Sequence, residues 1–165
     1  MDPQAARSYV LQKLRSGLPE ARTYHSLEHT LDVYASAVDI AEQEGITGEG
    51  LTLLKVAALY HDAGFTMQDM EHEKAGCELV REKLPEFGFT PAQVELICEM
   101  IMATRIPQTP RNKLARILCD ADLDYLGRGD FFRIGNTLFH GMRHYEVLST
   151  DREGHELQDR FLELH

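Results

Sequence analysis

The chain has no tryptophan, only three cysteines, and no apolar run close to the roughly 20 residues that a membrane-spanning helix needs. Its first residues lack the basic-then-apolar pattern of a secretion signal, so we expect a cytoplasmic protein. Basic residues are scarce as well, with 17 Lys and Arg against 27 Asp and Glu and a net charge of -10. Nucleic-acid polymers and anionic membranes attract basic surfaces, so we expect neither as a partner. A small phosphorylated substrate is compatible with this charge if a metal ion or local Arg and Lys residues neutralise it.

The three cysteines, Cys77, Cys98 and Cys119, show no C-x-x-C pair. Each falls in a stretch with helical periodicity. This pattern predicts buried free thiols rather than a disulfide framework or a zinc site.

Apolar residues recur with a helical period along the chain, and no stretch shows the sustained apolar/polar alternation of a half-exposed strand. Ser26 and Thr90 stand at N-cap positions, Pro91 fits a first helical position, and Gly45 fits a helix end. We predict helices over residues 5–14, 26–44, 50–61, 73–84, 91–103, 112–126, 131–148 and 154–164. The short connections between them predict one all-α domain, a helical bundle over residues 1–165. The chain stops inside an apolar-periodic stretch without a stop signal, which indicates a piece of a slightly longer protein.

The dipeptide His61-Asp62 ends an apolar helical run, and Gly64 follows shortly after it. An imidazole and a carboxylate in the last turn of a helix can converge on one small object. A metal ion suits this arrangement because both groups are standard metal ligands. For the dipeptide alone, a partly exposed His beside a surface Asp is the more ordinary interpretation.

Three further segments carry polar residues that are unusual in a hydrophobic core. His25 and His29 are four residues apart and can share a helical face. A second segment is Glu71-His72-Glu73. The third has three aspartates at alternate positions in an otherwise apolar stretch: Asp120, Asp122 and Asp124.

A buried carboxylate without a partner costs several kcal/mol, so at least one of these aspartates needs a cationic neighbour. Arg116 and Arg128 could supply it, and so could a metal ion. The residues alone leave these alternatives open.

The order of His29, His61-Asp62 and an Asp about 60 residues later resembles the H…HD…D signature of the HD-domain superfamily of metal-dependent phosphohydrolases. The resemblance covers roughly residues 20–130, which makes this the motif-bearing core and residues 131–165 its C-terminal helices. Residues 24–33, YHSLEHTLDV, are also similar to the Y-H-N-x-x-H-A-x-D-V segment of cyclic-nucleotide phosphodiesterases, which share the architecture. The resemblance implies a helical bundle with a divalent metal site.

By this resemblance the metal ligands are His29, His61, Asp62 and an Asp in an Ala-Asp-Leu segment. That segment matches Ala121-Asp122-Leu123, which favours Asp122 over Asp120. Such a ligand set suits Mn²⁺, Fe²⁺, Mg²⁺ or Zn²⁺, and it does not fix which.

Other candidate site residues each have an ordinary alternative. His25 matches the position that donates a proton to the leaving oxygen, and it could equally be a loop residue or a contact to a ligand. His72 could bind substrate or a second ion, or be an exposed residue before a helix. Arg105 and Lys113 could bind substrate phosphate or be surface residues. His140 and His144 share a helical face without an accompanying carboxylate motif, so we interpret them as surface or core-edge residues.

One departure from the family pattern concerns the metal count. A further histidine would be expected near the end of the helix over residues 91–103, where the chain reads MIMATR at residues 100–105. Its absence favours one ion per chain over two, and it weakens the interpretation as a di-iron oxygenase.

The function implied by the resemblance is hydrolysis of a phosphate ester or anhydride, with a nucleotide as the expected substrate, by a phosphomonoesterase or phosphodiesterase. A metal-activated water would attack, with Asp62 or Asp122 accepting its proton and His25 protonating the leaving oxygen. An alternative is a nucleotide-binding sensor or regulatory module with a mainly structural metal. A di-iron oxygenase is a third hypothesis.

Overall fold

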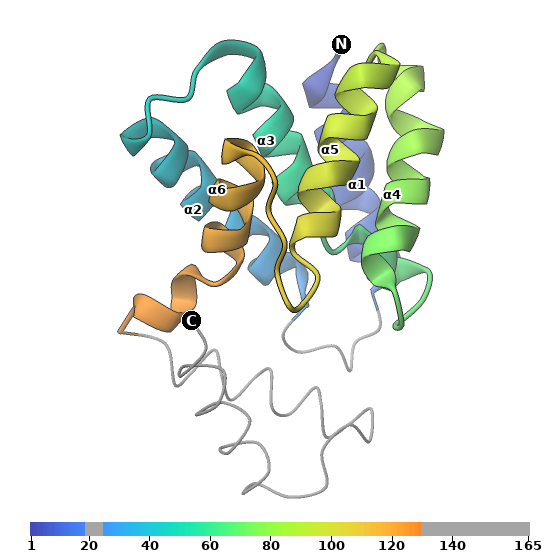
Figure 1. Ribbon diagram of the computed structural model, residues 1–165. Coiled ribbons are helices and arrows are strands. Elements are labelled where there is room, and N and C mark those ends of the chain that lie inside the picture. Colours follow the sequence, from blue (N-terminus) through green and yellow to red (C-terminus); the bar gives the residue numbers. More distant parts are fainter. Residues whose placement is uncertain (19–24, 130–165) are drawn as a thin grey trace, which may run out of the picture.

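The structure, a computed structural model, describes residues 1–18 and 25–129, and within these ranges it is helical without any β-strand (Figure 1). The prediction of an all-α fold is confirmed. The α-helices are α1 (Pro3–Gly17), α2 (Leu27–Gln43), α3 (Gly48–Tyr60), α4 (His72–Lys83), α5 (Pro91–Ala103) and α6 (Lys113–Asp122). Short 3-10 turns follow at η1 (Ala63–Thr66), η2 (Leu84–Phe87) and η3 (Asp124–Gly127).

The predicted helices agree with the structure to within a few residues, except at one end. The helix predicted over residues 112–126 ends at Asp122, because Leu123 leaves helical backbone geometry and the chain continues as η3. The helices predicted over residues 131–148 and 154–164 lie outside the described residues. None of the described helices is long and apolar enough to cross a membrane.

Side-chain caps fix where several helices begin. The Ser26 hydroxyl accepts a hydrogen bond from the backbone N–H of His29 at the start of α2. Thr90 forms a reciprocal capping box with Gln93 at the start of α5, and Pro91 takes the first helical position. Both caps were predicted, because Ser and Thr satisfy backbone N–H groups that have no partner inside the helix.

Helix α3 forms the centre of the bundle. It contacts α1, α2, α5 and α6, and most of its residues from Leu53 onward are buried. At its C-terminal end, the hydroxyl of buried Tyr60 donates a hydrogen bond to the Ala6 carbonyl oxygen of α1 (3.0 Å). A helix surrounded by others holds its last residues in fixed positions, and His61 follows directly after Tyr60.

Gly64 allows the segment after Asp62 to pack tightly against α4. A Cβ atom on Gly64 would lie 1.8 Å from the carbonyl oxygen of His72 and 2.7 Å from the backbone nitrogen of Gly76. No side chain fits there. Because residue 64 has no side chain, the start of α4 can lie beside His61-Asp62.

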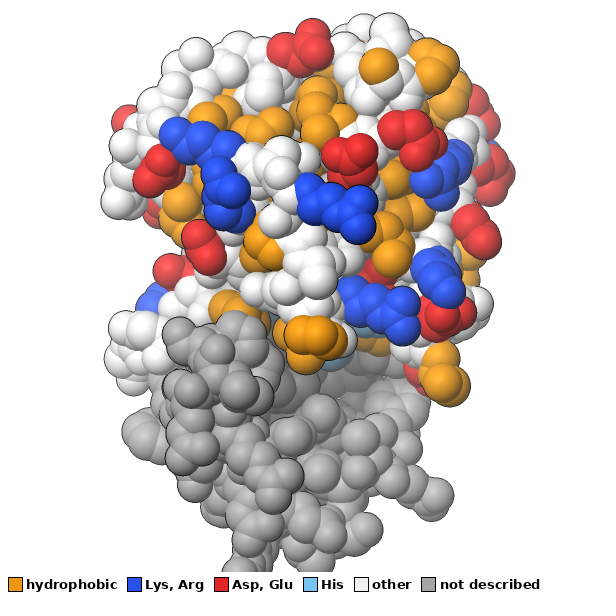
Figure 2. All heavy atoms as spheres, in the orientation of Figure 1, with side chains coloured by type: hydrophobic (Ala, Val, Ile, Leu, Met, Phe, Trp, Pro, Cys, Tyr) orange, Lys and Arg blue, Asp and Glu red, His pale blue; other side chains and the backbone are white. Residues whose placement is uncertain are grey.

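All three cysteines are buried and free, as predicted. The thiol of Cys77 on α4 donates to the Cys98 carbonyl oxygen of α5 (3.5 Å), and the Cys98 thiol donates back to the Cys77 carbonyl oxygen (3.7 Å). On the surface that Figure 2 shows, acidic and basic side chains are interspersed and form no single basic patch.

Candidate metal centre

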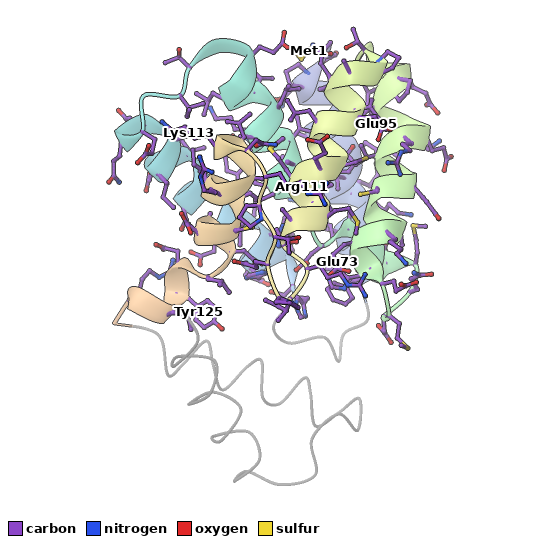
Figure 3. The ribbon with its side chains drawn as sticks, in the orientation of Figure 1. Met1, Glu73, Glu95, Arg111, Lys113 and Tyr125 are labelled. Carbon is purple, nitrogen blue, oxygen red and sulfur yellow. The ribbon has the colours of Figure 1, made fainter. Side chains whose placement is uncertain are left out.

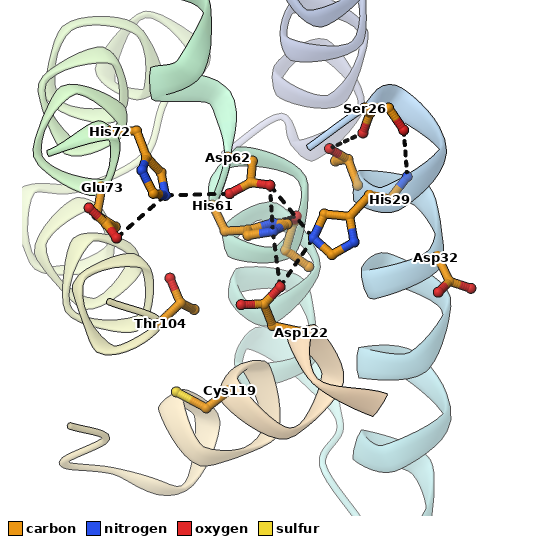
Figure 4. A network of polar contacts seen from close by, with 12 residues as sticks. Ser26, His29, Asp32, His61, Asp62, His72, Glu73, Thr104, Cys119 and Asp122 are labelled. Carbon is orange, nitrogen blue, oxygen red and sulfur yellow. Dashed lines mark hydrogen bonds and ion pairs between the residues drawn. The ribbon is translucent and has the colours of Figure 1, made fainter. Parts of the chain in front are cut away.

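Four polar side chains meet where α2, α3 and α6 converge (Figure 4). His29 lies in the first turn of α2, His61 and Asp62 directly follow α3, and Asp122 is the last residue of α6. The structure therefore brings together the four ligands implied by the resemblance.

The donor atoms of these residues lie close to one another. His29 Nε2 is 3.1 Å from Asp122 Oδ1 and 3.6 Å from Asp62 Oδ2. His61 Nε2 is 3.4 Å from Asp62 Oδ2 and 3.6 Å from Asp122 Oδ1. We call His29, His61, Asp122 and Asp62 Oδ2 the inner set.

The spacing of the inner set fits a divalent cation. Ligands bound at about 2.1 Å to an octahedral ion lie about 3.0 Å apart when adjacent and about 4.2 Å apart when opposite. The separations of 3.1 to 3.6 Å fall between these values. One donor atom each from His29, His61 and Asp122 lies within 4.8 Å of the others.

Two atoms of the inner set lack hydrogen bonds. His61 Nε2 and Asp62 Oδ2 are buried, and neither has a hydrogen-bond partner in the part of the chain that the structure describes. His61 Nδ1 lies 2.8 Å from the Ala58 carbonyl oxygen, so this nitrogen carries the hydrogen in the neutral ring and leaves the Nε2 lone pair for a cation. Leaving such groups unpaired costs about 1–3 kcal/mol each, which a bound cation would offset.

The electrostatics of the inner set favour ionised carboxylates. Burial disfavours the charge on Asp62, but neighbouring His61 outweighs it and holds the pKa of this carboxyl well below its usual range. Burial likewise opposes the charge on Asp122, but the neighbouring imidazoles of His29 and His61 outweigh it and lower the pKa of Asp122. Burial alone would lower the pKa of His61, but the two carboxylates raise it well above its usual value. A metal ion binding here would therefore displace a proton from the cluster.

A second group of donor atoms faces the other oxygen of Asp62. His72 Nε2 lies 3.6 Å from Asp62 Oδ1 and 3.4 Å from Glu73 Oε1. The His72 ring stacks on Phe65, with ring centroids 3.7 Å apart and planes 16° apart. We call His72, Glu73 and Asp62 Oδ1 the outer set.

His25 lies beside the cluster, as its proposed role requires. Its ring centroid is 4.4 Å from that of Phe65, 5.9 Å from that of His29 and 6.0 Å from that of His72. Burial lowers the pKa of His25 to about 4, so the ring is neutral at pH 7. Proton donation by His25 would need a nearby anionic substrate to raise that pKa again.

Lys113 is not brought to the cluster, contrary to the expectation that it binds substrate phosphate there. It begins α6 while Asp122 ends it, and nine residues of helix span about 13 Å. Its ammonium lies 2.9 Å from Glu44 Oε2 and donates to the Glu44 carbonyl oxygen. Lys113 therefore links the start of α6 to the end of α2, at the end of α6 that lies away from Asp122 (Figure 3).

Arg105 is exposed in the segment after α5. It lines a surface cleft of about 560 Å³ together with Met102, Ile106 and Arg111. Among the described residues no hydrogen bond or ion pair joins Arg105 to the inner or outer set. Its proposed contact with substrate phosphate stays a prediction.

The three aspartates near the end of α6 have different surroundings. Asp122 enters the inner set, and Asp120 is exposed. Asp124 accepts hydrogen bonds from Ser36 (3.0 Å) and Arg128 (3.3 Å). Arg128 is therefore the cationic partner of Asp124, which was one of the alternatives that the sequence left open.

Glu73 is the residue near the cluster that the sequence reasoning did not name as a ligand. The segment Glu71-His72-Glu73 is polar, but an acidic residue in the first turn of a helix is ordinary because it suits the helix dipole. The distinguishing property is burial, since Glu73 is only 7% exposed. Thr104, where a further histidine was expected, is buried, and its hydroxyl donates to the Ile101 carbonyl oxygen (2.8 Å). His140 and His144 lie outside the described residues.

Comparison with known proteins agrees with this geometry. The family model described as HD domain matches residues 26–124. Among solved structures, the chain is similar to a predicted HD superfamily hydrolase from an uncultured Thermotogales bacterium, with 26% sequence identity and a TM-score of 0.65. That similarity covers 95% of this chain and 86% of the other. No curated protein matches the chain.

Proposed function

This chain belongs to the HD-domain family of metal-dependent hydrolases, and we propose that it hydrolyses a phosphate ester or anhydride in a small molecule, with a nucleotide as the expected substrate class. The observation that carries the proposal is the inner set, where His61 Nε2 and Asp62 Oδ2 are buried without hydrogen-bond partners among the described residues. These atoms, with His29 and Asp122, are suited to hold a divalent ion. When bound, such an ion lowers the pKa of a water molecule and polarises a phosphoryl oxygen.

The carboxylates of the inner set are suited to accept the proton of the attacking water. The pKa values of Asp62 and Asp122 are both lowered, so each carboxylate is ionised at neutral pH. General base help of this kind contributes typically about 10²–10⁴ in rate. The His25 ring lies against Phe65, and we expect it to give a proton to the leaving oxygen once a bound anionic substrate has raised its pKa.

Phe65 packs against two of the imidazoles at the cluster. It is buried, and its ring lies against both His72 and His25. This packing fixes the orientation of both imidazoles beside the cluster.

The test is metal content together with turnover. Protein purified without chelator or added metal should contain tightly bound Mn, Fe, Zn or a similar ion by elemental analysis. It should hydrolyse at least one member of a panel of nucleoside monophosphates, cyclic nucleotides, nucleoside triphosphates and sugar phosphates, assayed with Mn²⁺, Fe²⁺, Mg²⁺ and Zn²⁺.

The variant His61→Ala should lose the tightly bound ion and at least about 10³-fold in kcat/KM, because it removes one of the four donor side chains of the inner set. Lys113→Ala is the matched control, since Lys113 lies at the far end of α6. Full turnover by metal-free wild-type protein would overturn the proposal.

A second candidate function is a nucleotide sensor with a structural ion. The observation that favours it is Thr104, whose buried hydroxyl stands where a further imidazole would be expected. Saturable nucleotide binding without turnover across the panel would support the sensor. A di-iron oxygenase would instead require two irons per chain and oxygen consumption.

A further inference from the structure

A surface cleft of about 560 Å³ lies beside the C-terminal half of α5, along the segment that leads to α6. Small-molecule sites in proteins usually have volumes of about 300–1,000 Å³. Among the described residues, the lining comes from α5 and from the segment between residues 105 and 112, and it includes no member of the inner or outer set. Figure 3 shows Arg111, one of the lining residues, on this segment beside α5. The cleft is therefore separate from the candidate metal centre.

Three hydrogen bonds hold the wall of this cleft in place. The backbone N–H of Thr109 donates to the Ala103 carbonyl oxygen at the end of α5 (3.2 Å). The side-chain amide of Gln108 donates to the Cys119 carbonyl oxygen of α6 (3.4 Å), and the Cys119 thiol donates to the Ala103 carbonyl oxygen (3.3 Å). These bonds tie the segment to both helices, so the walls need little rearrangement when a ligand binds.

Two arginines line the cleft without a partner. Arg105 and Arg111 are exposed, and neither makes a hydrogen bond or an ion pair within residues 1–18 and 25–129. Arg81, by contrast, pairs with Glu95 Oε1 at 2.8 Å. A guanidinium group matches a phosphate or carboxylate with two parallel N–H donors. Two unpaired arginines in one cleft of a chain with a net charge of -10 are therefore suited to bind an anion.

The rest of the lining fits an organic ligand better than a simple ion. Met102, Ile106 and Pro107 supply apolar surface, and Ile106 is 54% exposed. The carboxylate of Glu99 is exposed and can accept hydrogen bonds from hydroxyl or amino groups. Asn112 uses Oδ1 to cap α6 (2.9 Å), which leaves its NH₂ group available to donate. The cleft thus offers cationic, apolar and hydrogen-bonding groups together.

We propose that this cleft binds a nucleoside monophosphate as a second ligand, separate from the substrate at the candidate metal centre. A phosphate monoester carries a charge of about −1.5 to −2 at pH 7, which the two guanidinium groups balance. The apolar side chains pack against the base, and Glu99 accepts hydrogen bonds from the hydroxyl groups of the sugar. The inference does not rest on the proposed function, because no metal ligand contributes to the cleft.

The test is isothermal titration calorimetry of AMP, GMP, CMP and UMP with the full-length chain, freed of metal and of chelator. Without metal the nucleotides are not hydrolysed, so the heat reports binding alone. At least one nucleotide should bind saturably, at least tenfold more tightly than inorganic phosphate and than its own nucleoside. Arg111→Gln should weaken that binding at least tenfold, because it removes the charge and the two-pronged donor.

Arg116→Gln is the matched control, because Arg116 is exposed on α6 outside the cleft and its loss changes the net charge equally. Its affinity should change less than twofold. Saturating nucleotide should raise the melting temperature of the wild type and of Arg116→Gln, and raise that of Arg111→Gln less. No saturable binding at millimolar nucleotide, or equal weakening in the two variants, would overturn the proposal.

A third variant separates this proposal from the proposed function. Metal-free His61→Ala, shown by circular dichroism to be folded, should bind the nucleotide as the wild type does. Loss of binding in that variant would place the nucleotide at the metal centre and overturn the second ligand site. Binding that depends on Arg111, with no turnover of any phosphate compound, would leave the cleft site standing and remove the hydrolase.

Discussion

The two oxygens of Asp62 face donor sets that are built in different ways. The inner set takes residues from α2, α6 and the end of α3, and its His61 side chain is only 1% exposed. The outer set takes both of its other residues from the first turn of α4, and its most exposed side chain is His72, at 20% against 17% for Asp122 of the inner set. Packing of three helices fixes the inner set, whereas the outer set depends on how closely one helix approaches. The inner set is therefore suited to retain an ion, because three packed helices hold its side chains in place.

The largest expected effect comes from pushing the two sets apart. In Gly64→Ala, the new Cβ atom would meet the carbonyl oxygen of His72, so α4 must move away from the HD dipeptide. We expect a loss of about 3 kcal/mol or more in the free energy of unfolding, because backbone atoms cannot yield as a flexible side chain can. Chemical denaturation measures it.

A suitable control for that substitution is Gly127→Ala. A Cβ atom at Gly127 would have no described neighbour within 4 Å. Its stability should stay close to that of the wild type. Equal stability of Gly64→Ala and the wild type would show that α4 is not held by the close approach at Gly64.

Removal of one inner carboxylate tests whether the inner set alone retains the tight ion. Asp122→Asn should weaken tight metal binding by about 10- to 100-fold or more, since it removes a charged ligand. Asp120→Asn, two residues earlier and exposed, should leave binding unchanged. Competition with a fluorescent chelator measures both. Equal losses in the two variants would mean that net charge at the end of α6, rather than coordination by Asp122, governs affinity.

The smallest effect is expected from Lys113, which belongs to neither set. Its partner Glu44 is exposed, and exposed ion pairs contribute little to stability. Lys113→Ala should therefore keep its melting temperature within about 1–2 °C. Its kcat/KM should stay within twofold of the wild type on whichever substrate the panel identifies. A large rise in KM would restore Lys113 as a substrate-binding residue and contradict its placement.

The fold was largely predictable because its signals are local. Helical periodicity and the caps at Ser26 and Thr90 depend on residues only a few positions apart. The residues of the inner set were predictable for another reason, since His61-Asp62 stands out at the end of an apolar helix and the family resemblance selects Asp122. The position of Lys113 was not predictable from chemistry alone, because a charge near a ligand in sequence can lie a full helix away in space.

The sequence could not identify Glu73 as a residue of the outer set, because the burial of its side chain depends on a contact between two separate segments. An acidic residue at the start of a helix is normally solvated. Here the packing of Gly64 against the His72 carbonyl draws the first turn of α4 inward. In the sequence this contact is marked only by Gly64. The need for a glycine there becomes apparent only when the two segments are seen packed together.

The hydrogen bond from Tyr60 to Ala6 bears on how short a working fragment of this protein can be. The matched family segment begins at residue 26, yet Ala6, Val10 and Leu14 of α1 are buried in the core behind α3. A fragment that starts at residue 26 would retain every residue of the inner and outer sets. It would lose α1, whose Ala6 carbonyl oxygen accepts the hydrogen bond of Tyr60, the residue next to His61. The smallest unit able to position the candidate metal ligands is therefore expected to be longer than the segment that matches the family.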